Sequence, residues 1–243
     1  MLLVATPADI FLKVHGQTLV HWAIQTETLD LLPYAIKSCT SINSLNRDGM
    51  SPLHLATFCL SIDVVILLLD NGGDVNVVDK FGNSLLHFAV RIQSTEKLLL
   101  FLERGADLSV PNTFGELPIF MAAIHCNLEI AGLILATGFN PNVVNHQGRT
   151  TLHEAVCNHC IDMLPVLKHH GADINARDNK GVAPIHLAVE SNFLDTLEWL
   201  CKNGANVNLK TNEGFTALRL AAKYKLVDAV NILLEHGANP FVV

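Results

Sequence analysis

The residues of this chain that could do chemistry are mainly histidines and cysteines, and one group has the spacing of metal ligands. Cys157 and Cys160 form a C-x-x-C pattern, with His153 and His159 beside them and the His125–Cys126 pair upstream. C-x-x-C is typical of one half of a structural zinc site. A complete site needs a second closely spaced pair, and none follows at a usual interval. We therefore expect no bound metal.

Catalytic patterns are absent from the sequence. It contains no glycine-rich phosphate loop, no H-E-x-x-H and no G-x-S-x-G, which are the patterns of common hydrolytic and nucleotide-binding sites. We therefore predict that the chain is not an enzyme, with no catalytic residues and no cofactor. Its formal net charge of −7 argues against nucleic acid as a partner, since nucleic-acid-binding surfaces are basic.

The cysteines and the N-terminus bear on location. The six cysteines show no disulfide framework, and residues 1–14 lack the order of a secretory signal. These features predict free thiols in a reducing compartment, the cytoplasm or the nucleus. No apolar run approaches the ~18 residues that span a bilayer, so we expect no membrane insertion. We also expect the protein to be a monomer.

Glycines recur at a fixed interval along the whole chain. One series, with 33 residues between members, is Gly16, Gly49, Gly82, Gly115, Gly148, Gly181 and Gly214. A second series with the same interval is Gly72, Gly105, Gly138, Gly171, Gly204 and Gly237. Two series in phase indicate one structural unit repeated many times.

Each repeat carries the signals of two helices. A Ser or Thr follows most glycines of the first series by two residues, where its side chain can begin a helix. An acidic residue lies in the first turn of the second helix, where it complements the helix dipole. A glycine of the second series then ends that helix. We predict fourteen helices in antiparallel pairs.

The repeated motifs resemble those of ankyrin repeats. Residues 51–56, Ser-Pro-Leu-His-Leu-Ala, resemble the family's T-P-L-H-x-A, and residues 171–176, Gly-Ala-Asp-Ile-Asn-Ala, resemble its G-A-D-V-N-A. The resemblance implies an all-α solenoid of stacked helix-loop-helix units with β-turn fingers, in which the histidine ties adjacent loops. It also implies a non-enzymatic scaffold that binds a partner protein through the concave face, formed by the fingers and inner helices.

The expected organisation is a single array over residues 1–243. It comprises a half-repeat at 1–12 and repeats that start near 13, 46, 79, 112, 145, 178 and 211. The chain opens in mid-repeat and closes without a polar cap, so we keep an alternative. It could be a substrate-recruiting or regulatory module of a larger protein, an enzyme or a pathogen effector, whose active domain lies outside this chain.

The family's glycine between the two helices is replaced in every repeat. Its column holds Glu27, Leu60, Gln93, Cys126, His159, Asn192 and Lys225. A residue with a side chain in a left-handed turn costs up to ~1–2 kcal/mol.

Large side chains in the variable columns mark a candidate binding surface. Apolar groups concentrate in repeats two to four, and arginines lie in the same columns, so the predicted partner-binding residues are Met50, Phe58, Phe81, Arg91, Phe114, Ile124 and Arg149. Exposed apolar patches mark interaction sites, and aromatic residues with arginine dominate binding energies. Phe81 and Phe114 hold one column, so we expect their rings side by side, roughly 10 Å apart.

Three finger asparagines each have a leucine eight residues upstream. They are Asn76, Asn175 and Asn208, and the arrangement resembles sites that an asparaginyl oxygenase hydroxylates in ankyrin proteins. We favour the simpler interpretation that these side chains only bond the turn.

Overall fold

The computed structural model describes residues 16–59 and 61–241, which form two compact units that divide between Thr113 and Phe114. The described residues contain fourteen α-helices, and their β-structure is three isolated bridges without a sheet. The predicted all-α fold with fourteen paired helices is therefore confirmed.

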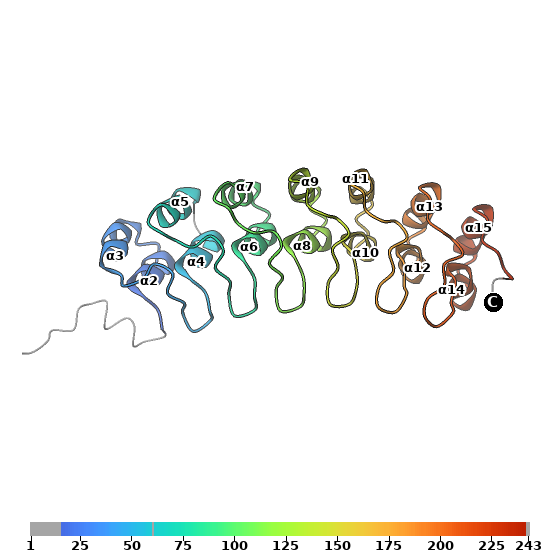
Figure 1. Ribbon diagram of the computed structural model, residues 1–243, viewed down its shortest axis with the longest axis horizontal. Helices are drawn as coiled ribbons and strands as arrows, with labels where there is room; N and C mark the ends of the chain where they lie inside the picture. Colours follow the sequence, from blue (N-terminus) through green and yellow to red (C-terminus); the bar gives the residue numbers. More distant parts are fainter. Residues whose placement is uncertain (1–15, 60, 242–243) are drawn as a thin grey trace, which may run out of the picture. The chain divides into compact units, whose positions relative to one another are not determined.

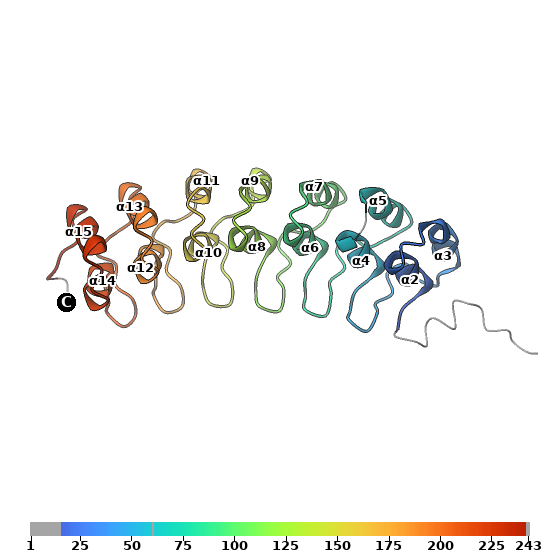
Figure 2. The same ribbon diagram turned by 180° about the vertical axis from the view of Figure 1, so that it is seen from behind.

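The first unit contains three helix pairs. Their bounds are α2 (Leu19–Gln25), α3 (Leu32–Ser38), α4 (Pro52–Cys59), α5 (Ile62–Asp70), α6 (Leu85–Arg91) and α7 (Thr95–Glu103), with a short 3-10 helix at Leu29–Leu31. The first helices of the pairs, α2, α4 and α6, pack side by side, and each contacts the second helix that follows it. Finger loops project from the first helices, on the side away from the second helices (Figures 1 and 2).

The second unit contains four helix pairs built in the same way. Their bounds are α8 (Pro118–Ile124), α9 (Leu128–Ala136), α10 (Thr151–Cys157), α11 (Met163–His169), α12 (Pro184–Glu190), α13 (Leu194–Lys202), α14 (Ala217–Lys223) and α15 (Val227–Glu235). The first helices α8, α10, α12 and α14 pack in sequence order. Among the described residues of either unit, no helix is long and apolar enough to cross a membrane.

The turn between the two helices of a pair adopts a left-handed conformation without glycine. Six residues there have φ between 50° and 59°, namely Glu27, Gln93, Cys126, His159, Asn192 and Lys225. This matches the column found in the sequence, whose remaining member, Leu60, lies outside the described residues. Each position keeps some backbone strain, of order 1–3 kcal/mol, so packing between helices must offset it.

Cys126 and Cys160 form a disulfide, with their Cα atoms 5.2 Å apart. The prediction of free thiols is therefore wrong for these two residues, whereas Cys39, Cys157 and Cys201 are free. The sequence separation of 34 is one repeat plus one residue, so stacking of consecutive repeats brings the two inter-helix turns together. Disulfides are rare in reducing compartments, so the cysteines no longer support a cytoplasmic or nuclear location. That location stays a prediction.

Buried histidines tie four of the first helices to the next finger. Nδ1 of His54 accepts a hydrogen bond from the Ser51 backbone N–H at 3.1 Å, and Nε2 donates to the Asn83 carbonyl at 3.3 Å. The same pair of bonds recurs at His21, His153 and His186. One ring nitrogen accepts and the other donates, so the bonds require a neutral imidazole. The role implied by the resemblance is confirmed.

These histidines make stability depend on pH. Burial in the core lowers the pKa of all four imidazoles, whereas histidines of the unfolded chain titrate near pH 6.5. The unfolded state therefore binds more protons as the pH falls, so this stability is complete above about pH 6.5 and is lost below it. We expect a lower urea midpoint at pH 5.5 than at pH 7.5, and a shallower dependence in His54→Gln. Equal midpoints at both pH values would contradict this.

The disulfide should add measurable stability to the second unit. It closes a loop over a sequence separation of 34, for which chain entropy gives about 3–4 kcal/mol. We expect reductant to lower the free energy of unfolding of the native chain by that order and to leave Cys126→Ser unchanged. A titration that finds every cysteine of the untreated protein as a free thiol would contradict the disulfide.

Candidate partner-binding surface

Four of the predicted partner-binding residues gather in the first unit. Met50 and Phe81 lie on neighbouring fingers, and Phe58 and Arg91 lie near the ends of α4 and α6. Phe58 is 53% exposed and Phe81 is 49% exposed. A hollow of about 250 Å³ is lined by Met50, Phe81 and Arg91, and the remaining lining residues are Asp48, Asp79, Lys80, Asn83 and Phe88. We call this set of residues, together with Phe58, the first-unit surface.

Arg91 is held by two aromatic rings. Its Cζ atom lies 4.6 Å from the ring centroid of Phe88 and 5.4 Å from that of Phe58. Phe88 is buried and also contacts the His54 ring, with centroids 5.0 Å apart. A guanidinium stacks favourably on aromatic faces, so a fixed ring in the core positions the Arg91 side chain at the surface.

Hydrogen bonds to backbone carbonyls fix the fingers that carry the apolar side chains. The Thr113 N–H donates to the Phe81 carbonyl at 2.8 Å, and His21 Nε2 donates to the Met50 carbonyl at 3.0 Å. Gly82 has a φ of 75°, and a Cβ atom there would lie 3.1 Å from the Asn112 Cα atom. Glycine is therefore needed for this close approach, and the exposed side chains project from a rigid backbone.

The other three predicted residues belong to the second unit. Phe114 is 66% exposed, Ile124 is half-buried at the end of α8, and Arg149 lies before α10. The expectation that the rings of Phe81 and Phe114 lie side by side stays a prediction, because the two residues belong to different units.

Arg149 differs from Arg91 in its surroundings. Its Nε lies 3.7 Å from Asp178 Oδ2, and its guanidinium reaches Glu154 Oε1 at 4.0 Å. Burial raises the pKa of the Glu154 carboxyl, and the nearby Arg149 charge partly opposes that rise. Arg149 is thus engaged by carboxylates of its own chain.

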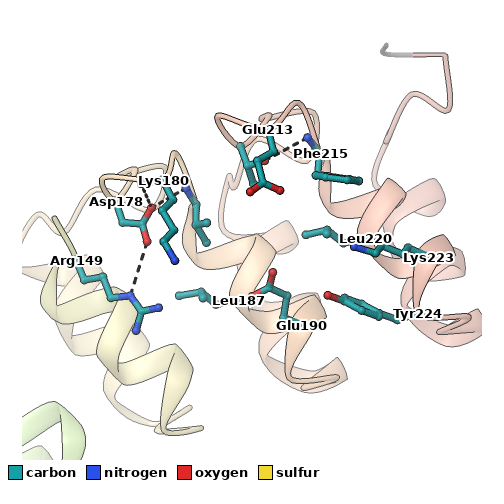
Figure 3. Close-up of a pocket in the computed structure, with 12 residues that line it drawn as sticks. Arg149, Asp178, Lys180, Leu187, Glu190, Glu213, Phe215, Leu220, Lys223 and Tyr224 are labelled. Atoms are coloured by element: carbon teal, nitrogen blue, oxygen red, sulfur yellow. Dashed lines mark hydrogen bonds and ion pairs between the residues drawn. The ribbon is translucent and has the colours of Figure 1, made fainter. Parts of the chain in front are cut away.

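A second hollow, of about 240 Å³, lies between the fingers and the helices α12 and α14 of the second unit (Figure 3). Arg149 lines it, together with Asp178, Lys180, Val182, Leu187, Glu190, Thr211, Glu213, Phe215, Leu220, Lys223 and Tyr224. The Lys223 ammonium lies 5.1 Å from the Phe215 ring centroid and 5.6 Å from that of Tyr224. The sequence analysis did not select this hollow, although Phe215 occupies the same variable column as Met50, and Lys223 the same column as Arg91.

Comparison with known proteins decides the family. A family model described as ankyrin repeats matches the chain in three copies, at residues 1–79, 86–178 and 175–242. The chain is a member of the ankyrin repeat family. Among solved structures, it is similar to the ankyrin repeat domain of Bcl-3, described as a unique member of the IkappaB protein family, with 26% identity and a TM-score of 0.79. The match covers 90% of this chain and 99% of that one.

A search of curated proteins gave no match. Ankyrin repeat domains are generally protein–protein interaction modules and are typically non-catalytic. The family therefore supports a binding role and leaves the partner to be identified from the surface.

The group with metal-ligand spacing is engaged by other contacts in this ankyrin structure. Cys126 and Cys160 are joined in the disulfide, and the His159 ring stacks on Phe193 at 4.1 Å. His159 Nε2 lies 2.9 Å from Asp195 Oδ1, and this bond lowers the pKa of the Asp195 carboxyl. Among the described residues, no three His, Cys, Asp or Glu side chains are arranged to hold a metal ion.

Metal content tests this interpretation. We expect elemental analysis of the purified protein to find far less than one zinc per chain, because Cys126 and Cys160 of the candidate group are joined in the disulfide. Zinc near one per chain that disappears in Cys160→Ser would overturn it.

The finger asparagines of these ankyrin repeats bond neighbouring fingers. Asn76 Nδ2 donates to the Gly105 carbonyl at 3.3 Å, and Asn76 Oδ1 accepts from the Asp107 N–H at 2.9 Å. Asn175 and Asn208 make the equivalent bonds. Both ends of each amide are used, which supports the structural interpretation.

Proposed function

We propose that this protein is a non-enzymatic interaction scaffold that binds a partner protein through the face formed by its fingers and first helices. The observation that carries the proposal is the first-unit surface, where Phe58 and Phe81 are about half exposed beside the hollow that Met50 lines. Large apolar groups grouped in this way are typical of interaction sites.

The energetics favour binding by these side chains. Complete burial of an exposed Phe ring contributes about 1.5–3 kcal/mol, and aromatic residues and arginine are enriched among residues that dominate binding. The Phe81 finger is held by the Thr113–Phe81 backbone bond. A partner therefore does not have to order this loop, and less of the binding free energy is lost to entropy.

The proposal extends to the second unit and to the chain as a single array of repeats over residues 1–243. Phe114, Ile124 and Arg149 occupy the same columns of their repeats as the first-unit residues. We propose that they contribute to the same partner contact, with the protein acting as a monomer.

The test uses the full chain as bait, with variants divided by unit. Partners captured from cells of the source organism are quantified for the native chain, for Phe58→Ala/Phe81→Ala and for Phe114→Ala/Ile124→Ala. Leu99→Ala is the matched control, because Leu99 is a 43% exposed side chain on α7 that does not line the hollow.

We expect the first-unit pair to weaken binding of the purified partner by more than about tenfold, which two lost ring burials easily supply. The Phe81→Ala/Phe114→Ala pair should do the same. The melting temperature should stay nearly constant, because the substituted rings are exposed. Undiminished binding, or joint loss of fold and binding, would show that these residues do not form the docking surface.

A further inference from the structure

We propose that the first-unit surface recognises an acidic side chain. The partner segment that docks there presents an aspartate or glutamate to Arg91, flanked by large apolar side chains that fill the hollow. This inference rests on the proposed function and names the chemistry of the partner.

The charges around the hollow point to Arg91. Lys80 Nζ is paired with Asp48 Oδ1 at 3.0 Å. Asp79 Oδ1 accepts the backbone N–H groups of Phe81 and Asn83 at 2.8 Å each, and its other oxygen accepts from the Asn83 amide at 3.1 Å. Within the described residues, Arg91 is the lining cation with no carboxylate within 4.0 Å.

The guanidinium of Arg91 is preorganised for a planar acceptor. Its Cζ atom lies over the rings of Phe88 and Phe58, 4.6 and 5.4 Å from their centroids, and a guanidinium that stacks on aromatic rings can still donate hydrogen bonds from its N–H edges. A carboxylate accepts two parallel bonds from such an edge. Lysine would offer a point charge without the planar edge, so the geometry predicts that arginine is required here.

The surroundings of that edge favour a side chain from a protein. Phe58, Phe81 and Met50 offer apolar surface next to the charge, which matches a carboxylate with apolar neighbours. A phosphate group would bring up to two negative charges and three strong acceptor oxygens. Asp48 and Asp79 lie in the same lining, and Arg91 is its single uncommitted cation among the described residues, so a carboxylate is the better match.

The test begins with phage-displayed random dodecamer peptides, selected on the immobilised full chain and, in parallel, on Arg91→Ala. Arg104→Ala is the matched control, because it also removes one positive charge but from a residue paired with Asp70 at 2.9 Å, outside the hollow. We expect peptides selected on the native chain to be enriched in Asp or Glu within four positions of Phe, Leu, Ile or Trp.

The best peptide is then synthesised with its acidic residue and with the matching amide, Asn or Gln. On the native chain and on Arg104→Ala, we expect the amide to bind at least about tenfold more weakly, as for loss of a charged hydrogen-bond pair. On Arg91→Ala, the acidic peptide and its amide counterpart should bind with equal affinity. On Arg91→Lys, the acidic peptide should bind only slightly more tightly than the amide.

The remaining outcomes overturn the inference. They are a selected pool with no acidic excess, an acid and an amide that bind alike on the native chain, and failure to select any binder. If apolar peptides bind Arg91→Ala normally but are lost on Phe58→Ala/Phe81→Ala, the acidic requirement fails and the docking surface stands. If binding survives both changes, the docking surface proposed above fails as well.

Discussion

The interaction on which this structure depends is the hydrogen bond from a neutral, buried imidazole to the carbonyl of the next finger. His21 reaches the Met50 carbonyl and His54 reaches the Asn83 carbonyl, so two fingers of the first-unit surface are held by histidines in the core. Desolvation lowers the pKa of both rings and so favours the neutral form, in which Nδ1 can accept the N–H at the start of the helix. Protonation of Nδ1 would remove the acceptor for the backbone N–H at the start of the helix, and this hydrogen bond would be lost. The stability of the repeat and the positions of the fingers that carry Met50 and Asn83 therefore depend on the neutral state of these imidazoles.

This arrangement separates the residues that build the fold from those that are free to bind. Alanines such as Ala56 and Ala89 are fully buried in the first helices, and their small size lets neighbouring helices approach closely. The finger backbone is occupied by its own hydrogen bonds, and Asn76 adds a side-chain tie between fingers. The exposed side chains of the first unit include Phe58 and Phe81. These side chains can differ between repeats without disturbing the core.

The elements that recur were predictable from the sequence, and the contacts made by single residues were not. The glycine series and the Ser/Thr column predicted the helix pairs, because each depends on local backbone chemistry repeated every 33 residues. The disulfide was missed because the cysteines were compared by local spacing, whereas Cys126 and Cys160 meet through the stacking of consecutive repeats. Likewise, Arg91 and Arg149 occupy variable columns and look equivalent in sequence. Their difference appears only where Asp178 and Glu154 approach Arg149 and aromatic rings approach Arg91.

That difference bears on how repeats of one architecture could select a partner under the proposed function. In the first-unit surface, the acids are satisfied within the chain and a stacked guanidinium remains among apolar groups. In the second unit, the hollow combines Glu190 and Glu213 with Lys180 and Lys223 (Figure 3), and no ion pair among the described residues involves these four. A partner that suits an unpaired cation beside aromatic rings is poorly matched to a hollow of mixed charge, because each unmatched charge it buries costs free energy. Under the proposed function, selectivity follows from which charges the scaffold leaves unpaired, while the repeats supply a common framework.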